Sequence, residues 1–261
     1  MNLMLVNFYD WLIEKGDLGV GPGLWCTLHI ILMVFLFLWI IACWIVFSKH
    51  KTLALKVTKI VCYLMIFFRI GRMLLLMISG KESVVQALPW HLCHIMAIVF
   101  PLFYLTGTKK FFMPIVCVTF FGGILTFIFG DYYKFATLSF LQYESLFLHF
   151  CMPTVVVGVL ATNYIQIKSQ DLWQIPIILV MLALYASLGN LLVPEANFLF
   201  LKANGLPFNL FGNAHFYFTY AVLLIILTII FVLIMIFISK VNLKKEQNFR
   251  NKVRQKVDNI K

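Results

Sequence analysis

Two side chains able to carry covalent chemistry lie within long apolar stretches of this 261-residue chain, Cys93 and His149. A cysteine attacks as its thiolate, which a helix N-terminus or a nearby cation favours. A histidine on another helix can take the thiol proton and later activate an acceptor. The pair therefore predicts Cys–His nucleophilic catalysis. The alternative is structural, with Cys93 packed among aliphatic side chains and His149 hydrogen-bonded to a neighbour.

Further ionisable residues lie inside or at the edges of the same stretches: Arg69, Arg72, His91, His94 and Glu144. An ionisable side chain at membrane depth costs roughly 2.5–3.5 kcal/mol, so each marks a candidate functional site. The two arginines are three residues apart and share a helix face. We expect one of them to pair with Glu144 or Asp131; alternatively, they hold a lipid phosphate or carboxylate in bidentate fashion.

A metal site is the competing interpretation of His91, Cys93 and His94. Zinc ligands on a single helix favour histidines four residues apart, whereas these two are three apart and the cysteine lies on another face. We therefore predict no metal and no cofactor. Nucleotide-binding glycine loops and a Gly-x-Ser-x-Gly elbow are also absent from the sequence, and the Gly122-Gly123 pair is expected to permit close helix packing.

Composition identifies the elements that must position these groups. Hydrophobic residues make up 62% of the chain and charged residues 12%, against about 45–50% and 25% in soluble domains. This predicts an all-α polytopic membrane bundle at 1–240, opening with an interfacial helix at 1–20 that is not a secretory signal. A basic tail follows at 241–261. The predicted bundle has seven spans, at about 24–47, 57–79, 88–106, 111–130, 138–162, 172–193 and 215–239.

Lysine and arginine in the connections predict the orientation. One side carries 15 of these residues and the other carries four, which places the N-terminus outside the cell membrane and the C-terminus in the cytoplasm. The net charge of +11 then needs no nucleic-acid partner, because anionic lipid beside the loops and tail accounts for it. With this orientation the buried polar residues gather in the outer half of the membrane.

Three short motifs carry a family resemblance. Residues 88–95, Leu-Pro-Trp-His-Leu-Cys-His-Ile, resemble the Leu-Pro-Leu-His-Leu-Cys-Ser-Ile signature of the bacterial YwaF-type integral membrane proteins. His149 falls where that family carries a histidine on its fifth span. The stretch 189–201, which contains Asn190 and Asn197, resembles its Gly-x-Asn-Tyr-x-Tyr-Leu loop. The chain departs from the signature at three positions, Trp90, His94 and Phe198.

The YwaF-type family is similar, more distantly, to eukaryotic transmembrane acyltransferases that remodel ether phospholipids. The resemblance implies that Cys93 is the nucleophile and His149 the base of acyl transfer through a thioester. It also implies membrane lipids as partners, among them an acyl donor and a lysophospholipid. The remaining polar residues would then bind substrate: Arg69, Arg72, His91, His94, Glu144, Asn190 and Asn197.

Two other classes of function stay open at this point. The same polar groups suit a transporter or binding protein for a small anionic solute or a lipid. Against transport, the sequence shows neither an inverted repeat nor a pair of interrupted helices. A seven-helix receptor is a third class, although the short tail resembles no signalling module.

Overall fold

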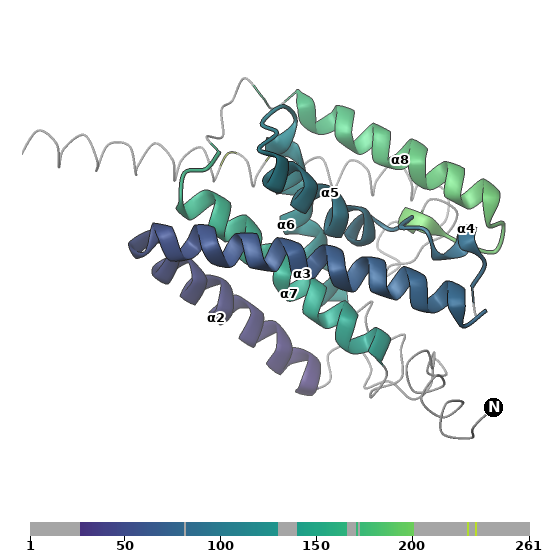
Figure 1. Ribbon diagram of the computed structural model, residues 1–261, viewed down its shortest axis with the longest axis horizontal. Coiled ribbons are helices and arrows are strands. Elements are labelled where there is room, and N and C mark those ends of the chain that lie inside the picture. Colours follow the sequence, from purple (N-terminus) through teal and green to yellow (C-terminus); the bar gives the residue numbers. More distant parts are fainter. Residues whose placement is uncertain are drawn as a thin grey trace, which may run out of the picture.

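All regular structure in the described part of the chain is helical, which confirms the all-α prediction there (Figure 1). The computed structural model describes residues 27–80, 82–129, 140–165, 171 and 173–200, together with positions 229 and 233. The elements are α2 (Thr27–Lys49), α3 (Lys51–Ile78), α4 (Val84–Ala87), α5 (Leu92–Thr106), α6 (Phe112–Phe129), α7 (Phe140–Ala161), α8 (Gln174–Leu192) and the 3-10 turn η3 (Phe198–Phe200).

Four of these helices, α2, α3, α7 and α8, are long and apolar enough to cross a membrane. Helices α5 and α6 are also apolar but shorter. Six of the seven predicted spans thus correspond to helices. The interfacial helix at 1–20 and the tail at 241–261 lie outside the described residues, as does the seventh span at 215–239 except for Ile229 and Leu233. The number seven therefore stays a prediction.

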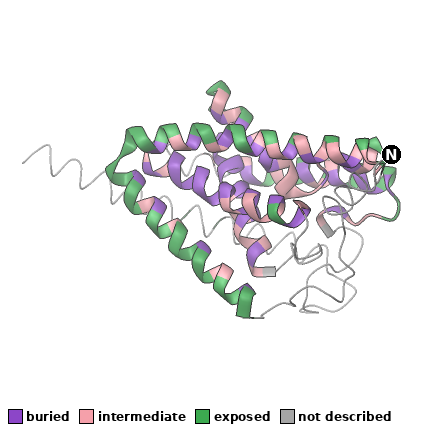
Figure 2. Ribbon diagram, turned by 60° about the horizontal axis from the view of Figure 1, so that its bottom comes forward, coloured by how far each residue is buried: buried purple, intermediate pink, exposed green. Residues whose placement is uncertain are grey.

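Helix α7 lies at the centre of the bundle. It buries 15 of its 22 residues and packs against α2, α3 and α6. Helix α2, by contrast, buries a narrow seam with spacings of seven, seven and four residues: His29, Leu36, Cys43 and Phe47. Its remaining surface is apolar and exposed, as expected of a helix that faces lipid (Figure 2).

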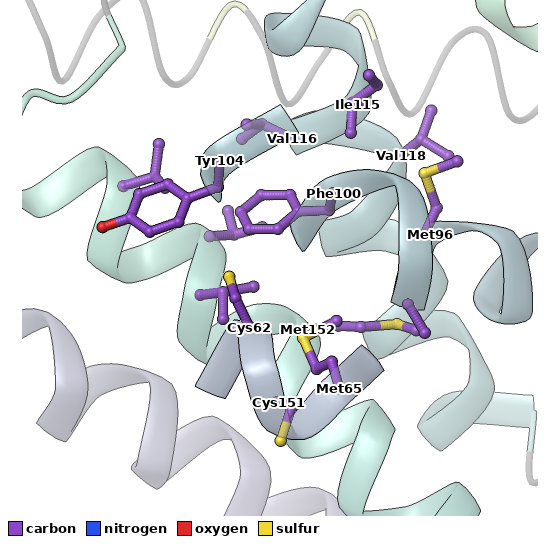
Figure 3. Close-up of a cluster of buried hydrophobic side chains, with 14 of the residues drawn as sticks. Cys62, Met65, Met96, Phe100, Tyr104, Ile115, Val116, Val118, Cys151 and Met152 are labelled. Atoms are coloured by element: carbon purple, nitrogen blue, oxygen red, sulfur yellow. The ribbon is translucent and has the colours of Figure 1, made fainter. Parts of the chain in front are cut away.

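The largest core cluster fills the space between α3, α5, α6 and α7 (Figure 3). Sulfur-containing and aromatic side chains dominate the part shown there: Cys62, Met65, Met96, Phe100, Tyr104, Cys151 and Met152. Methionine fills irregular gaps between helices because its side chain is unbranched and flexible. This apolar core fixes the relative positions of the helices that carry the polar residues.

Close helix contacts depend on two glycines of these packed helices. A Cβ added at Gly123 on α6 would lie 2.9 Å from the Pro153 ring and 3.0 Å from the Met152 Cβ on α7. At Gly158 on α7, an added Cβ would collide with the Thr58 hydroxyl on α3. The predicted packing role of the glycine pair on α6 is therefore confirmed for Gly123, whereas a Cβ at Gly122 would make an ordinary 3.9 Å contact with Leu92.

These contacts predict opposite outcomes at two adjacent residues. Gly123→Ala is expected to lower the free energy of unfolding by about 1–3 kcal/mol, because the proline ring it meets cannot rotate away. Gly122→Ala should leave stability unchanged or slightly raised, since alanine favours helix. Chemical denaturation in detergent micelles measures both variants. Equal stability of the two variants would contradict the close packing of α6 on α7.

Helix α5 begins later than predicted, at Leu92 and not at Leu88. The residue before a proline is excluded from helical geometry, and Leu88, which precedes Pro89, is extended with ψ 155°. The four residues before Leu88 form α4. Ser83 and Gln86 cap the N-terminus of α4 with reciprocal hydrogen bonds. The 15 residues of α5 measure only about 22 Å, against about 30 Å of hydrocarbon. Helix α5 alone is therefore too short to cross the hydrocarbon core.

Candidate functional site

The predicted site residues on the helices gather at one end of the bundle. Helix α3 runs toward this end, while α5 and α7 run away from it (Figure 1). Arg69 and Arg72 lie in the last third of α3, Cys93 in the first turn of α5, and Glu144 in the second turn of α7. Direct packing of α3 against both α5 and α7 brings the three sets together.

A buried ion pair forms the centre of the cluster. Arg72 donates from Nη1 to Oε2 of Glu144 at 2.8 Å, which confirms the predicted pairing of an arginine with a buried acid. Arg69 Nη1 lies 3.8 Å from the other carboxylate oxygen, within ion-pair range but beyond a hydrogen bond. All three side chains are buried. The alternative partner, Asp131, lies outside the described residues.

Histidines border the ion pair on the side of α5. His94 lies close enough to Arg69, Arg72 and His149 for their charges to interact through the protein interior. The His91 ring contacts His94 edge-on, with 5.3 Å between ring centroids. His94 thus lies within electrostatic range of the arginines on α3 and of His149 on α7.

His149 is held in a defined tautomer. Its Nδ1 lies 2.5 Å from the backbone carbonyl oxygen of Ser145, one turn earlier on α7. A carbonyl oxygen can only accept, so Nδ1 carries the proton and donates it. In the neutral ring the lone pair is then on Nε2, which is the protonation state that a general base requires. The Phe127 ring packs edge-on against the imidazole, with centroids 6.5 Å apart.

Cys93 differs from the other described cysteines in its surroundings. Four of them, Cys43, Cys62, Cys117 and Cys151, are buried, whereas Cys93 is only half-buried. It is the second residue of α5, where unpaired backbone amides favour a negative charge, and Arg69 lies within electrostatic range. Both conditions favour a thiolate. A direct hydrogen bond between Cys93 and His149 stays a prediction, although both border the Arg69–His94 region.

The loop after α8 covers the start of α5. Asn190 accepts a 2.7 Å hydrogen bond from the Phe198 amide and donates a 3.1 Å bond to the Phe198 carbonyl. Its side chain therefore fixes the loop geometry, while Asn197 beside it is half-buried. The substrate-binding roles predicted for both asparagines stay predictions.

Two departures from the sequence signature, Trp90 before α5 and Phe198 in this loop, contact each other. The Trp90 and Phe198 ring centroids are 5.9 Å apart, and Phe198 also meets His91 edge-on at 5.1 Å. The Trp90 indole lies against Gly189 so closely that a Cβ there would be 2.6 Å from its ring. The changes at positions 90 and 198 thus form one aromatic contact, which holds His91 above the N-terminus of α5.

Among the described residues, no three side chains of His, Cys, Asp or Glu are arranged to hold a metal ion. The sequence analysis did not single out a buried histidine, His29 on α2. Its Nε2 donates to the Phe127 carbonyl at 2.6 Å, next to the ring that packs on His149. A histidine inside an otherwise apolar span was the available signal.

Comparisons with known proteins give a family but no characterised relative. No curated protein and no solved structure matches the chain significantly. The family model that matches, over residues 24–238, is that of the TMEM164 family. This match names neither the YwaF-type proteins nor an acyl-transfer reaction, so both stay predictions. The match covers most of the chain, including every described helix, and the chain is therefore a multi-pass membrane protein that belongs to the TMEM164 family.

Proposed function

We propose that this protein is a membrane acyltransferase that moves an acyl chain between lipids through a thioester on Cys93. The observation that carries the proposal is the environment of this thiol, which combines a helix N-terminus, the charge of Arg69 and a nearby histidine cluster. His149 supplies the base, because its Nδ1–H is committed to the Ser145 carbonyl and its lone pair is on Nε2.

In the first half-reaction, Nε2 of His149 takes the thiol proton and the sulfur attacks the ester carbonyl carbon of the donor lipid. The carbon–oxygen bond to the donor breaks, and the imidazolium returns the proton to the departing alkoxide. In the second half, His149 takes a proton from the acceptor hydroxyl, whose oxygen attacks the thioester. The carbon–sulfur bond breaks and the thiolate regains the proton, so that enzyme and protons balance.

The other polar residues orient the substrate in this proposal. Arg69, Arg72, His91 and His94 supply positive charge and hydrogen-bond donors, and Glu144 holds the arginines in place. Asn190 shapes the covering loop, whose residue Asn197 lies beside it. No cofactor takes part in this mechanism.

The direct test is an acyl-transfer assay. Purified protein is incubated with a phosphatidylcholine bearing an isotopically labelled acyl chain and with an unlabelled lysophospholipid, and mass spectrometry follows the label. We expect labelled acceptor to form, and hydroxylamine to release the acyl group from trapped enzyme. The function would be refuted if no tested donor gave either labelled product or acylated protein.

His149→Ala is expected to lower the transfer rate by about 10²–10⁴-fold, because the general base is lost. The variant should still fold, since the ion pair and the core do not depend on the imidazole. His29→Ala provides the control, as it removes another buried histidine at the same end, one that donates to the Phe127 backbone carbonyl. If both variants lose activity equally, His149 acts through packing and not as the base.

The site is proposed to open toward the outer leaflet, from the asymmetry of the basic residues. Two reporter enzymes are fused to the C-terminus, one active only in the cytoplasm and one active only outside the cell. We expect activity from the cytoplasmic reporter alone. A second fusion after Thr108, in the connection between α5 and α6, should report the same side. Activity of the outside reporter at either position would invert the orientation and place the site toward the cytoplasm.

A second function is kept because the buried arginines favour it. A binding or transport protein for a small anion or a lipid would use the same positive cluster without a covalent step. It predicts ligand binding that persists in a Cys93→Ser variant and no acylated protein.

A further inference from the structure

Within the described part of the chain, Arg69 is a buried cation with hydrogen-bond donors left unfilled. The residue is 2% exposed. Among the described residues, neither its Nε nor its Nη1 has a hydrogen-bond partner. Its contact with Glu144 is 3.8 Å long, whereas Arg72 bonds that carboxylate at 2.8 Å. The two arginines are therefore not equivalent: Arg72 neutralises Glu144, and Arg69 stands beside an acid that is already paired.

Charge in this region is unbalanced in favour of an anion. Among the described residues, Arg69 and Arg72 face one buried carboxylate, that of Glu144, and both Cys93 and the half-buried Glu82 act on Arg69 more weakly than Glu144 does. Buried guanidinium donors without partners cost free energy, which an incoming anion would recover by accepting their hydrogen bonds. The planar fork of arginine matches the oxygen pairs of a phosphate.

The depth of Arg69 suits the phosphate of a lipid. Helix α3 has 28 residues, about 42 Å, and exceeds the hydrocarbon core of about 30 Å by roughly 6 Å at each end when centred. Arg69 lies nine residues before the last helical residue, about 14 Å along the axis. It thus lies about one and a half helical turns below the headgroup layer, within electrostatic range of Cys93.

We propose that Arg69 anchors a phosphate-binding site beside Cys93, which takes the phosphodiester of a phospholipid. The proposal deepens the acyltransferase function and rests on it for the role of Cys93. The two arginines then have different roles: Arg69 binds the ligand, and Arg72 pairs with Glu144.

Equilibrium binding to the full-length protein in dodecyl maltoside, a phosphate-free detergent, tests this site. All measurements use the Cys93→Ser background, so that no acyl transfer occurs. The probes are radiolabelled 1-oleoyl-lysophosphatidylcholine, monooleoylglycerol as the same acyl glycerol without phosphate, and inorganic phosphate. We expect lysophosphatidylcholine to bind at least tenfold more tightly than monooleoylglycerol.

Arg69→Gln is expected to weaken lysophosphatidylcholine binding about ten- to a hundredfold and to leave monooleoylglycerol binding unchanged. The matched control is Lys59→Gln, which removes an exposed cation from the same helix and should change neither. Arg69→Lys keeps the positive charge but lacks the planar guanidinium group. It replaces Arg69→Gln in the binding measurements if the glutamine variant does not fold. It should weaken binding several-fold.

Unchanged lysophosphatidylcholine affinity in the Arg69 variants, or equal affinity for monooleoylglycerol, would overturn the site. The affinity for inorganic phosphate distinguishes a site for a lipid phosphodiester from a site for free phosphate. A lipid site should bind it at least a hundredfold more weakly than lysophosphatidylcholine, and equal affinity would overturn the lipid assignment in favour of free phosphate. Binding that depends on Arg69 in a protein without transferase activity would refute the proposed function alone; transfer that is insensitive to Arg69 would refute this inference alone.

Discussion

Cys93→Ser is expected to abolish acyl transfer, with a loss of roughly three orders of magnitude or more. A serine hydroxyl has nearly the size of the thiol, so the fold should be retained. Its proton is far harder to remove, because neither the first turn of α5 nor the charge of Arg69 can stabilise an alkoxide as they stabilise a thiolate. The same mass-spectrometric assay measures the loss, and the trapped acyl-enzyme should disappear with it.

The control for this variant is Cys43→Ser, a cysteine of α2 that packs in a separate cluster. It should keep activity close to that of the parent protein. If Cys93→Ser retains full activity, thioester catalysis is wrong and the binding or transport function replaces it. Equal loss in both variants would instead point to a general sensitivity of the bundle to buried hydroxyls.

Glu144→Gln is expected to lower the free energy of unfolding by about 3–5 kcal/mol. The carboxylate is buried between two guanidinium groups, and its removal leaves both positive charges without a counter-charge in the interior. Reversible unfolding in mixed micelles, followed by tryptophan fluorescence, measures the change. Glu195→Gln is the control: that carboxylate is exposed, accepts from Gln86 and should contribute less than about 1 kcal/mol.

A double variant sharpens the test of the pair. Arg72→Gln with Glu144→Gln removes one charge of each sign, so its loss should be smaller than the sum of the two single losses. Additive losses would mean that the two side chains do not stabilise each other. A Glu144→Gln protein as stable as its parent would show that the arginines find another counter-charge.

Several features could be predicted from the sequence because each depends on the residues of one segment and on the free energy of placing them in a membrane. Apolar length predicted six of the described helices, and the cost of an arginine at membrane depth predicted its pairing with Glu144. The start of α5 could not be predicted, because it depends on tertiary contacts of the buried Trp90 as well as on Pro89. Nor does the sequence state which nitrogen of His149 carries the proton, since only the position of the Ser145 carbonyl determines it.

The pairing between α3 and α7 also constrains how the protein is made. Arg72 and Glu144 are separated by 72 residues, so during translation α3 leaves the ribosome well before its counter-charge has been synthesised. Two arginines at roughly 2.5–3.5 kcal/mol each then oppose insertion of that segment. Stable integration of α3 is therefore delayed until α7 arrives, and a nascent chain stopped before Glu144 should be extracted from the membrane more readily than one stopped after it.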